Sequence, residues 1–178
     1  MNFPDQPTLT GETLHLRPLR GDDIPALTHA ASDPAIWAGH PARDRYKPEV
    51  FAPYAHMLLR SGGALVVTDK ASGSVIGCSR YYPAPETPKA YGIGYTFLTR
   101  PYWGGAANRE MKALMLDHAF EHMDQVWLHV DPANIRSQRA TLKIGARFVE
   151  EAQRNLGGKI GIWRCYVVER DAWRACQT

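Results

Sequence analysis

The chain has 178 residues, of which 44% are hydrophobic and 22% charged, and its formal net charge is +3. This composition is ordinary for a globular protein and excludes a disordered tail or a collagen-like chain. The basic residues are spread along the chain, which argues against a nucleic-acid-binding surface. We expect a single domain over residues 1–178, because one domain usually occupies about 100–200 residues.

The cysteines and the N-terminus indicate the compartment. Cys78, Cys165 and Cys176 form no CxxC pair, which argues against a disulfide framework and fits a reducing environment. The N-terminus has no apolar core of signal-peptide length, and no run of about 18 apolar residues would span a membrane. We therefore expect a cytoplasmic protein without a membrane partner.

In chain order, the alternating stretch 13–19 predicts a first strand, and Asp22 and Asp23 before Pro25 predict a helix over 23–31. Residues 33–46, rich in Pro, Gly, His and Trp, predict a loop. The following elements are a helix at 48–60, strands at 64–69, 74–82 and 90–98, a helix at 107–122, a strand at 125–130, a helix at 134–143, and strands at 146–152 and 161–169, joined through Asn155 and Gly157-Gly158. This order predicts a mixed α/β domain with an antiparallel start and one crossover helix.

The most informative segment is 95–112, where a strand ends near Leu98 and Trp103-Gly104-Gly105 leads directly into a helix. Small residues at a helix start leave backbone N–H groups uncovered, and these favour an anion such as a pyrophosphate. The segment is not GxGxxG, and no acidic residue stands at the dinucleotide spacing, so a Rossmann site is disfavoured. A plain structural turn is the alternative.

Three motifs in this part of the chain are IGYTFLTRPYWGG, NREMKALMLDHAF and NIRSQRATLKIGA. Together they resemble the GNAT superfamily of N-acetyltransferases, most closely its ribosomal-protein-acetylating (RimJ/RimL-type) branch. The motifs cover about 92–146, and the element order covers nearly the whole chain. The resemblance implies a single-domain α/β fold: a GNAT-like mixed, mostly antiparallel twisted sheet of about seven strands, flanked by about four helices.

The same resemblance implies a function. Acetyl-CoA would be the co-substrate, and its acetyl group would pass to a primary amine of a protein N-terminus or a small molecule by direct attack in a ternary complex. A catalytically silent acyl-CoA-binding sensor or interaction module is the alternative. An exposed edge strand would allow a homodimer.

The resemblance also assigns site residues. The phosphate loop falls on Trp103, Gly104, Gly105, Ala106, Ala107 and Asn108. The pantetheine arm would pair with the strand end and contact a following asparagine, namely Phe97, Leu98, Thr99 and Asn134. The Tyr that many members use as an acid is Thr141 here, so the serine of the branch, Ser137, is the predicted proton donor to the thiolate, with an ordinary helix-cap role as the alternative.

No general base is evident from the sequence. His129, near the end of the strand at 125–130, is the catalytic candidate, because histidine side chains in general change charge near neutral pH, with a packed structural histidine as the alternative. Glu86, in the Pro-rich loop, could also face an acceptor cleft, but it is predicted to be a solvated charge. The loop at 33–46 predicts either an acceptor-binding wall or a core-capping Trp with solvated neighbours, from Trp37, His40, Arg43 and Tyr46.

The helix at 107–122 carries two further patterns. Asn108 and Lys112 fall on its apolar face, so Asn108 is predicted to fix the loop, and Lys112 either to serve the cofactor or a carboxylate or to reach around the helix edge to water. Residues 118–122 match H-x-x-E-H, a zinc pattern. No third ligand is recognisable, so no metal is expected, and a zinc hydrolase is a third hypothesis.

Overall fold

The computed structural model describes residues 3–156 and 158–175. Its strands are β1 (Leu9–Thr10), β2 (Leu14–Pro18), β3 (Ala64–Asp69), β4 (Val75–Pro83), β5 (Tyr91–Leu98), β6 (Gln125–Val130), β7 (Arg147–Leu156) and β8 (Lys159–Glu169). Its α-helices are α1 (Ile24–Ala30), α2 (Pro34–Trp37), α3 (Pro48–Ser61), α4 (Ala106–Phe120), α5 (Ile135–Lys143) and α6 (Arg170–Ala175), with 3₁₀ turns η1 (Gly21–Asp23) and η2 (Arg100–Tyr102). Within these residues no helix is long and apolar enough to cross a membrane.

The seven predicted strands and the four predicted helices all form, which confirms the α/β class. The described part of the chain adds the short elements β1, α2 and α6. The helix α2 lies in a segment predicted to be loop, because Asp33 Oδ1 accepts a hydrogen bond from Ala35 N at 2.9 Å and Pro34 occupies the first helical position. The predicted β7–β8 link is partly outside the described residues, since Gly157 is not among them.

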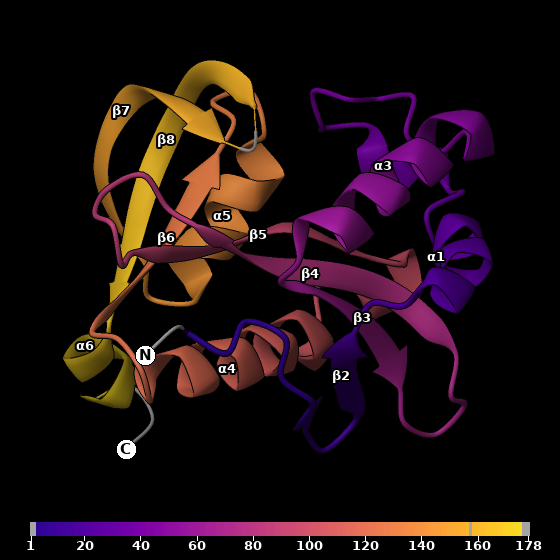
Figure 1. Cartoon of the computed structure of the whole chain (residues 1–178), viewed down its shortest axis with the longest axis horizontal. Coiled ribbons are helices and arrows are strands. Elements are labelled where there is room, and N and C mark those ends of the chain that lie inside the picture. Colours follow the sequence, from indigo (N-terminus) through magenta and orange to yellow (C-terminus); the bar gives the residue numbers. More distant parts are fainter. Residues whose placement is uncertain (1–2, 157, 176–178) are drawn as a thin grey trace.

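One sheet joins the described strands in the order β1-β2-β3-β4-β5-β6-β8-β7. Every neighbouring pair is antiparallel except β5 and β6, which are parallel. A parallel pair needs a crossover connection, and η2 and α4 supply it. Figure 1 shows β6, β7, β8 and α5 on one side of the molecule, and β2, β3, α1 and α3 on the other.

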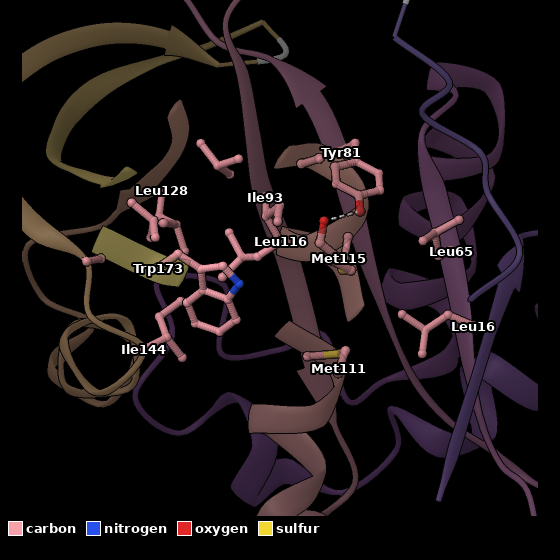
Figure 2. Close-up of a cluster of buried hydrophobic side chains, with 14 of the residues drawn as sticks. Leu16, Leu65, Tyr81, Ile93, Met111, Met115, Leu116, Leu128, Ile144 and Trp173 are labelled. Carbon is pink, nitrogen blue, oxygen red and sulfur yellow. Dashed lines mark hydrogen bonds between the residues drawn. The ribbon is translucent and has the colours of Figure 1, made fainter. Parts of the chain in front are cut away.

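Both faces of the central strands are covered. Leu65 and Val67 of β3 belong to a core cluster packed with α4, whereas Ala64 and Val66 belong to a second cluster packed with α1 and α3. This double burial explains why β3 reads as a continuous apolar run. In the first cluster Tyr81 Oη donates a hydrogen bond to the Met115 carbonyl at 2.6 Å, which ties β4 to α4 (Figure 2).

The strands β5 and β6 separate soon after they meet. They pair only at Tyr91 with Val126 and at Gly92 with Trp127, although β5 continues to Leu98. A β-bulge accompanies the separation, because Tyr95 and Thr96 together stand opposite the single residue Ser79. Tyr95 has φ +54°, a left-handed conformation that is uncommon for a tyrosine, and such bulges bend a strand. The strand edges beyond the last pair are therefore free of each other.

Candidate active site

A cleft of about 990 Å³ opens where β5 and β6 separate. We call it the central cleft. The end of the cleft beside α4 is lined by Trp103, Gly104, Gly105, Asn108 and Arg109. We call the other end the hairpin end, because residues of the antiparallel pair β7 and β8 lie there; it is lined by Arg45, Tyr54, Leu156, Lys159 and Trp163. Both parts of the split sheet contribute walls, so the cleft depends on the separation of the two strands. A cleft of this size with convergent polar groups is a common kind of ligand site.

The α4 end has the features of an anion site. Gly104 adopts φ +69°, which favours glycine, and a Cβ atom added at Gly104 or Gly105 would meet no atom within 4 Å. Gly105 is the N-cap of α4, and the first turn contains no acidic residue. The first backbone N–H groups of a helix have no partner within it, and here no side chain caps them. A pyrophosphate group therefore fits this end.

Basic residues near this end take different roles. Arg100 forms an ion pair with Asp33, which fastens η2 to the start of α2. Arg109 is exposed and lines the cleft. The Arg136 guanidinium lies 4.2 Å from the centre of the Trp103 ring and donates to the Ile36 carbonyl at 2.6 Å. Arg136 thus links α5 to α2.

The sequence-predicted donor-binding residues lie around this end, but only some face the cleft. Phe97, Leu98, Trp103, Gly104, Gly105, Asn108 and Asn134 line it, whereas Thr99, Ala106 and Ala107 do not. Leu98 O accepts a hydrogen bond from Trp103 Nε1 at 2.7 Å, and Thr99 N donates to Ile76 O at 2.8 Å. Part of the strand end predicted for pantetheine is therefore already hydrogen-bonded within the protein.

A hydrogen-bonded chain of titratable side chains lies deeper in the structure. Tyr82 Oη is 2.7 Å from His129 Nδ1, and His129 Nε2 is 2.8 Å from Glu86 Oε1. Arg154 Nε donates to the same oxygen at 3.4 Å. Tyr82 and His129 line the central cleft. Among these residues His129 was the predicted catalytic candidate and Glu86 was predicted to be solvated, whereas no catalytic role was predicted for Tyr82 or Arg154.

Glu86 is not the solvated charge that the sequence predicted. Its side chain is 8% exposed, and that of His129 is fully buried. Burial by itself would raise the pKa of Glu86, but the hydrogen bonds from His129 and Arg154 hold it below its usual value. The carboxylate is therefore ionised at neutral pH, and it accepts the proton on His129 Nε2. His129 Nδ1 is then free to accept the Tyr82 hydroxyl proton.

Two glycines make room for the Tyr82 ring. A Cβ atom at Gly92 would come within 2.5 Å of Tyr82 Cζ, and one at Gly94 within 2.9 Å of Tyr82 Cε1. The ring thus lies close against the backbone of β5 and reaches His129 on the far side of that strand. Burial raises the pKa of Tyr82 well above its usual range, so the phenol is neutral. The glycine spacing in Y-G-I-G-Y was the sequence signal for this contact.

Ser137 and Asn134 lie at the start of α5 and line the cleft. Asn134 is the N-cap, because its Oδ1 accepts a hydrogen bond from Ser137 N at 3.1 Å. The cap is thus the asparagine side chain, and among the described residues the Ser137 hydroxyl has no partner. Thr141 is buried one helical turn further on.

One prediction for Lys112, that its side chain reaches around the edge of the helix to water, is wrong. Lys112 is 7% exposed, and its Nζ donates to Thr96 Oγ1 at 2.9 Å, within the bulge of β5. Ser79 Oγ lies 2.7 Å from the same hydroxyl. Burial lowers the pKa of Lys112 to about 7. Asn108 has no side-chain hydrogen bond within residues 3–156 and 158–175, so a role in fixing the loop gains no support.

Two groups of side chains have spacings that could hold a metal ion. Ligand atoms of His118, Glu121 and His122 lie within 4.8 Å of one another, but Glu121 and His122 are exposed, and His118 Nε2 is 2.8 Å from the Pro4 carbonyl oxygen. This group lies outside the central cleft. The second group is Glu86, His129 and Cys165. The Arg154 guanidinium beside Glu86 disfavours a further cation there.

Two of the four residues predicted for an acceptor-binding wall line the cleft. Trp37 and His40 line the cleft, whereas Arg43 and Tyr46 do not, and Arg45, which the sequence analysis missed, does. Trp37 also has the alternative role, because it is 3% exposed and its Nε1 donates to Ala31 O at 2.8 Å. The same tryptophan therefore belongs to the core and to the cleft.

The comparisons with known proteins agree with this architecture. The family model described as acetyltransferase (GNAT) domain matches residues 13–147. No curated protein matches the sequence. Enzymes of the GNAT family use acetyl-CoA as their acyl donor.

Solved structures share the fold. A GCN5-related N-acetyltransferase from Brucella melitensis superposes with a TM-score of 0.80 at 20% identity, over 97% of this chain and 83% of that one. An acetyltransferase from Agrobacterium tumefaciens has a TM-score of 0.68 at 25% identity, over 92% and 95%. The ribosomal-protein-S5-alanine acetyltransferase from Vibrio fischeri has a TM-score of 0.64 at 18% identity, over 94% and 98%. Since the family model covers well over half of the sequence, the chain belongs to the GNAT family of acetyltransferases.

Proposed function

We propose that this protein transfers an acetyl group from acetyl-CoA to a primary amine while both are bound in the central cleft. The observation that carries the proposal is that one cleft is lined both by an uncapped helix N-terminus and by the Tyr82–His129 pair, which is hydrogen-bonded to the buried Glu86. The first suits the anionic donor, and the second suits removal of a proton from an amine. Bound acetyl-CoA supplies the acetyl group as a thioester.

The residues present fit the donor. Gly104 and Gly105 leave open space above the first turn of α4, where backbone N–H groups would hold the pyrophosphate. The free edges of β5 and β6 offer backbone groups to the amides of the pantetheine arm. Arg109 would add a positive charge at this end.

The base is the Tyr82–His129 pair. A primary amine is mostly protonated at neutral pH and must lose a proton to become a nucleophile. Tyr82 Oη would take a proton from the amine while its own proton moves to His129 Nδ1. The imidazolium that results lies against the ionised Glu86 carboxylate, which favours it. Glu86 Oε2, which has no hydrogen-bond partner in the described structure, adds to that negative field.

Ser137 is the acid in this proposal. Ser137 lines the cleft, its hydroxyl has no partner among the described residues, and its backbone N–H is held by the Asn134 cap. That arrangement leaves the hydroxyl free to give a proton to the departing sulfur. The N-cap also holds the backbone of Ser137 in place at the start of α5.

The acceptor is proposed to be a protein N-terminus or a small amine. The name of the Vibrio fischeri neighbour refers to an alanine of ribosomal protein S5, which supports including N-terminal peptides in the search. Purified protein is incubated with acetyl-CoA and a panel of peptides, amino acids and polyamines, and free CoA thiol and acetylated product are measured. Amine-dependent thiol release with a matching product supports the proposal. Binding of acetyl-CoA without turnover on any amine contradicts it and favours an acyl-CoA sensor.

A further inference from the structure

The hairpin end of the cleft contains an arginine in an unusual setting. Arg45, between α2 and α3, places its guanidinium carbon 3.8 Å from the centre of the Tyr54 ring and 5.6 Å from that of Trp37. It is half-buried, lines the cleft, and has neither a carboxylate nor a hydrogen-bond partner in the part of the chain that the structure describes.

Other arginines of the protein are used differently. Arg17 bonds Asp23 through two nitrogens, at 2.7 and 2.8 Å, and Arg154 contacts both Glu86 and Glu150. A guanidinium stacked on an aromatic ring keeps the N–H groups at its edge free, and that edge matches a carboxylate with two parallel hydrogen bonds. Arg45 is therefore held by rings in a position that leaves its donors available to a ligand.

A second cation lies in the same region. Lys159, at the start of β8, lines the cleft, and its Nζ lies 5.3 Å from the centre of the Trp163 ring. No acidic partner of Lys159 occurs among residues 3–156 and 158–175. Arg45 and Lys159 come from segments far apart in the sequence, so the fold brings two positive charges to this end of the cleft.

The pKa of His40 indicates that Arg45 and Lys159 act on the same region of the cleft. Burial, then Arg45 and then Lys159 lower the pKa of His40 to about 4, while Asp131 acts in the opposite direction. His40 is thus neutral near pH 7 and adds no charge. Asp131 is the acidic residue that faces this region, and its Oδ1 already accepts a hydrogen bond from Ala133 N at 2.9 Å. The field at the hairpin end is therefore net positive.

We propose that the acceptor of this enzyme is an amine that also bears a carboxylate, and that Arg45, supported by Lys159, binds that carboxylate. The inference rests on the proposed acetyl transfer and specifies its substrate class. The carboxylate can belong to an acidic residue near the N-terminus of a peptide, or to the free carboxyl group of a small amino acid. Arg45 is a specificity-determining residue in this view and takes no part in moving protons.

The test uses acceptor pairs that differ only in the negative charge. Peptide amides beginning Ala-Asp or Ala-Glu are compared with Ala-Asn or Ala-Gln, and short peptides with a free carboxyl group are compared with their amides. For each, kcat/KM is measured from release of CoA thiol. The acidic member is expected to be preferred about tenfold or more, which is the usual effect of a charge-assisted hydrogen-bonded pair. Which pairs show the preference distinguishes the two carboxylate sources.

Substitutions test whether Arg45 is the residue responsible for the preference for acidic acceptors. Arg45→Gln is expected to abolish the preference for acidic acceptors, with little change in kcat/KM for the neutral acceptors or in the KM for acetyl-CoA. Arg45→Lys is expected to retain part of the preference. Arg43→Gln is the matched control, because Arg43 is exposed and lies outside the cleft, and it should keep the full preference. Equal rates for charged and neutral acceptors would overturn the inference and leave the acetyl transfer intact. An equal loss of kcat/KM for charged and neutral acceptors in Arg45→Gln would also overturn the inference.

A binding measurement separates this inference from the proposed function. The same peptides are titrated calorimetrically into the protein saturated with CoA. Tighter binding of the acidic peptide to the wild type than to Arg45→Gln supports the inference even where no amine is acetylated, whereas equal binding of acidic and neutral peptides overturns it.

Discussion

Tyr82 on β4 and His129 on β6 share a hydrogen bond of 2.7 Å across the intervening strand β5. The contact exists because Gly92 and Gly94 leave the ring of Tyr82 room on the β5 backbone. It brings a phenol at the cleft wall into line with a buried imidazole and carboxylate. The proposed proton path depends on this relationship.

Gly92→Ala tests how closely the ring is fitted. The new Cβ would lie 2.5 Å from Tyr82 Cζ, so the ring must move. We expect a loss of about 1–3 kcal/mol in unfolding free energy, as for other overpacked sites, together with a fall in turnover. Denaturant titration measures the first and CoA release the second. Gly21→Ala is the control, since a Cβ there meets nothing within 4 Å, and a Gly92→Ala protein as stable as this control would contradict the packing account.

Glu86→Gln removes the charge that holds His129. Because the pKa of Glu86 is below its usual value in the folded protein, the carboxylate stabilises the fold above about pH 4.5, and this contribution is lost as the pH falls through the folded-state pKa. The variant should therefore be less stable than the wild type at pH 7, and the difference should shrink in acid. Melting temperatures across pH measure this. Glu151→Gln, at an exposed position of β7, should show no such trend.

Lys112→Met is expected to raise the stability of the protein at pH 7, whereas Glu86→Gln is expected to lower it. Burial lowers the pKa of Lys112 from 10.5 to about 7, so between these pH values the unfolded chain holds a proton that the folded protein has released. Wild-type stability therefore rises with pH across this window. We expect Lys112→Met to melt at a higher temperature than the wild type at pH 7, with a gap that narrows towards pH 10. A gap independent of pH, like that of the exposed-site control Lys47→Met, would argue against a buried lysine.

Ser137→Ala tests the proposed acid. The cap at α5 uses the backbone N–H of residue 137, which alanine retains, so the melting temperature should stay close to that of the wild type. Loss of a positioned acid is expected to lower kcat about 100-fold with little change in the KM for acetyl-CoA. Unchanged turnover would remove Ser137 from the mechanism.

The sequence predicted the elements well because strands and helices are marked by local periodicity and by Gly and Pro signals. The open, uncapped start of α4 at Gly104 and Gly105 could also be predicted, because it is contained in one short segment. The Tyr82–His129–Glu86 chain could not be predicted from local sequence signals, because its hydrogen bonds join residues that are 47 and 43 positions apart in the sequence.

Burial of the charged residues depended on tertiary structure in the same way. Glu86 was predicted to be solvated because it lies in a Pro-rich loop, but the fold packs that loop against β6 and β7, where His129 and Arg154 meet its carboxylate. Lys112 was placed on the correct face of its helix, yet its partner Thr96 lies in a bulge that the strand pattern does not reveal.

The most direct test of the account is the turnover of Tyr82→Phe, measured with acetyl-CoA and an amine that the wild type acetylates. The substitution removes only the oxygen that joins the cleft to His129. We predict that kcat falls about 100-fold or more, while the calorimetric affinity for acetyl-CoA is unchanged and the loss is largest at low pH, where the amine is most fully protonated. A Tyr82→Phe protein that binds acetyl-CoA normally and turns over at the wild-type rate at every pH would contradict the proposed proton path.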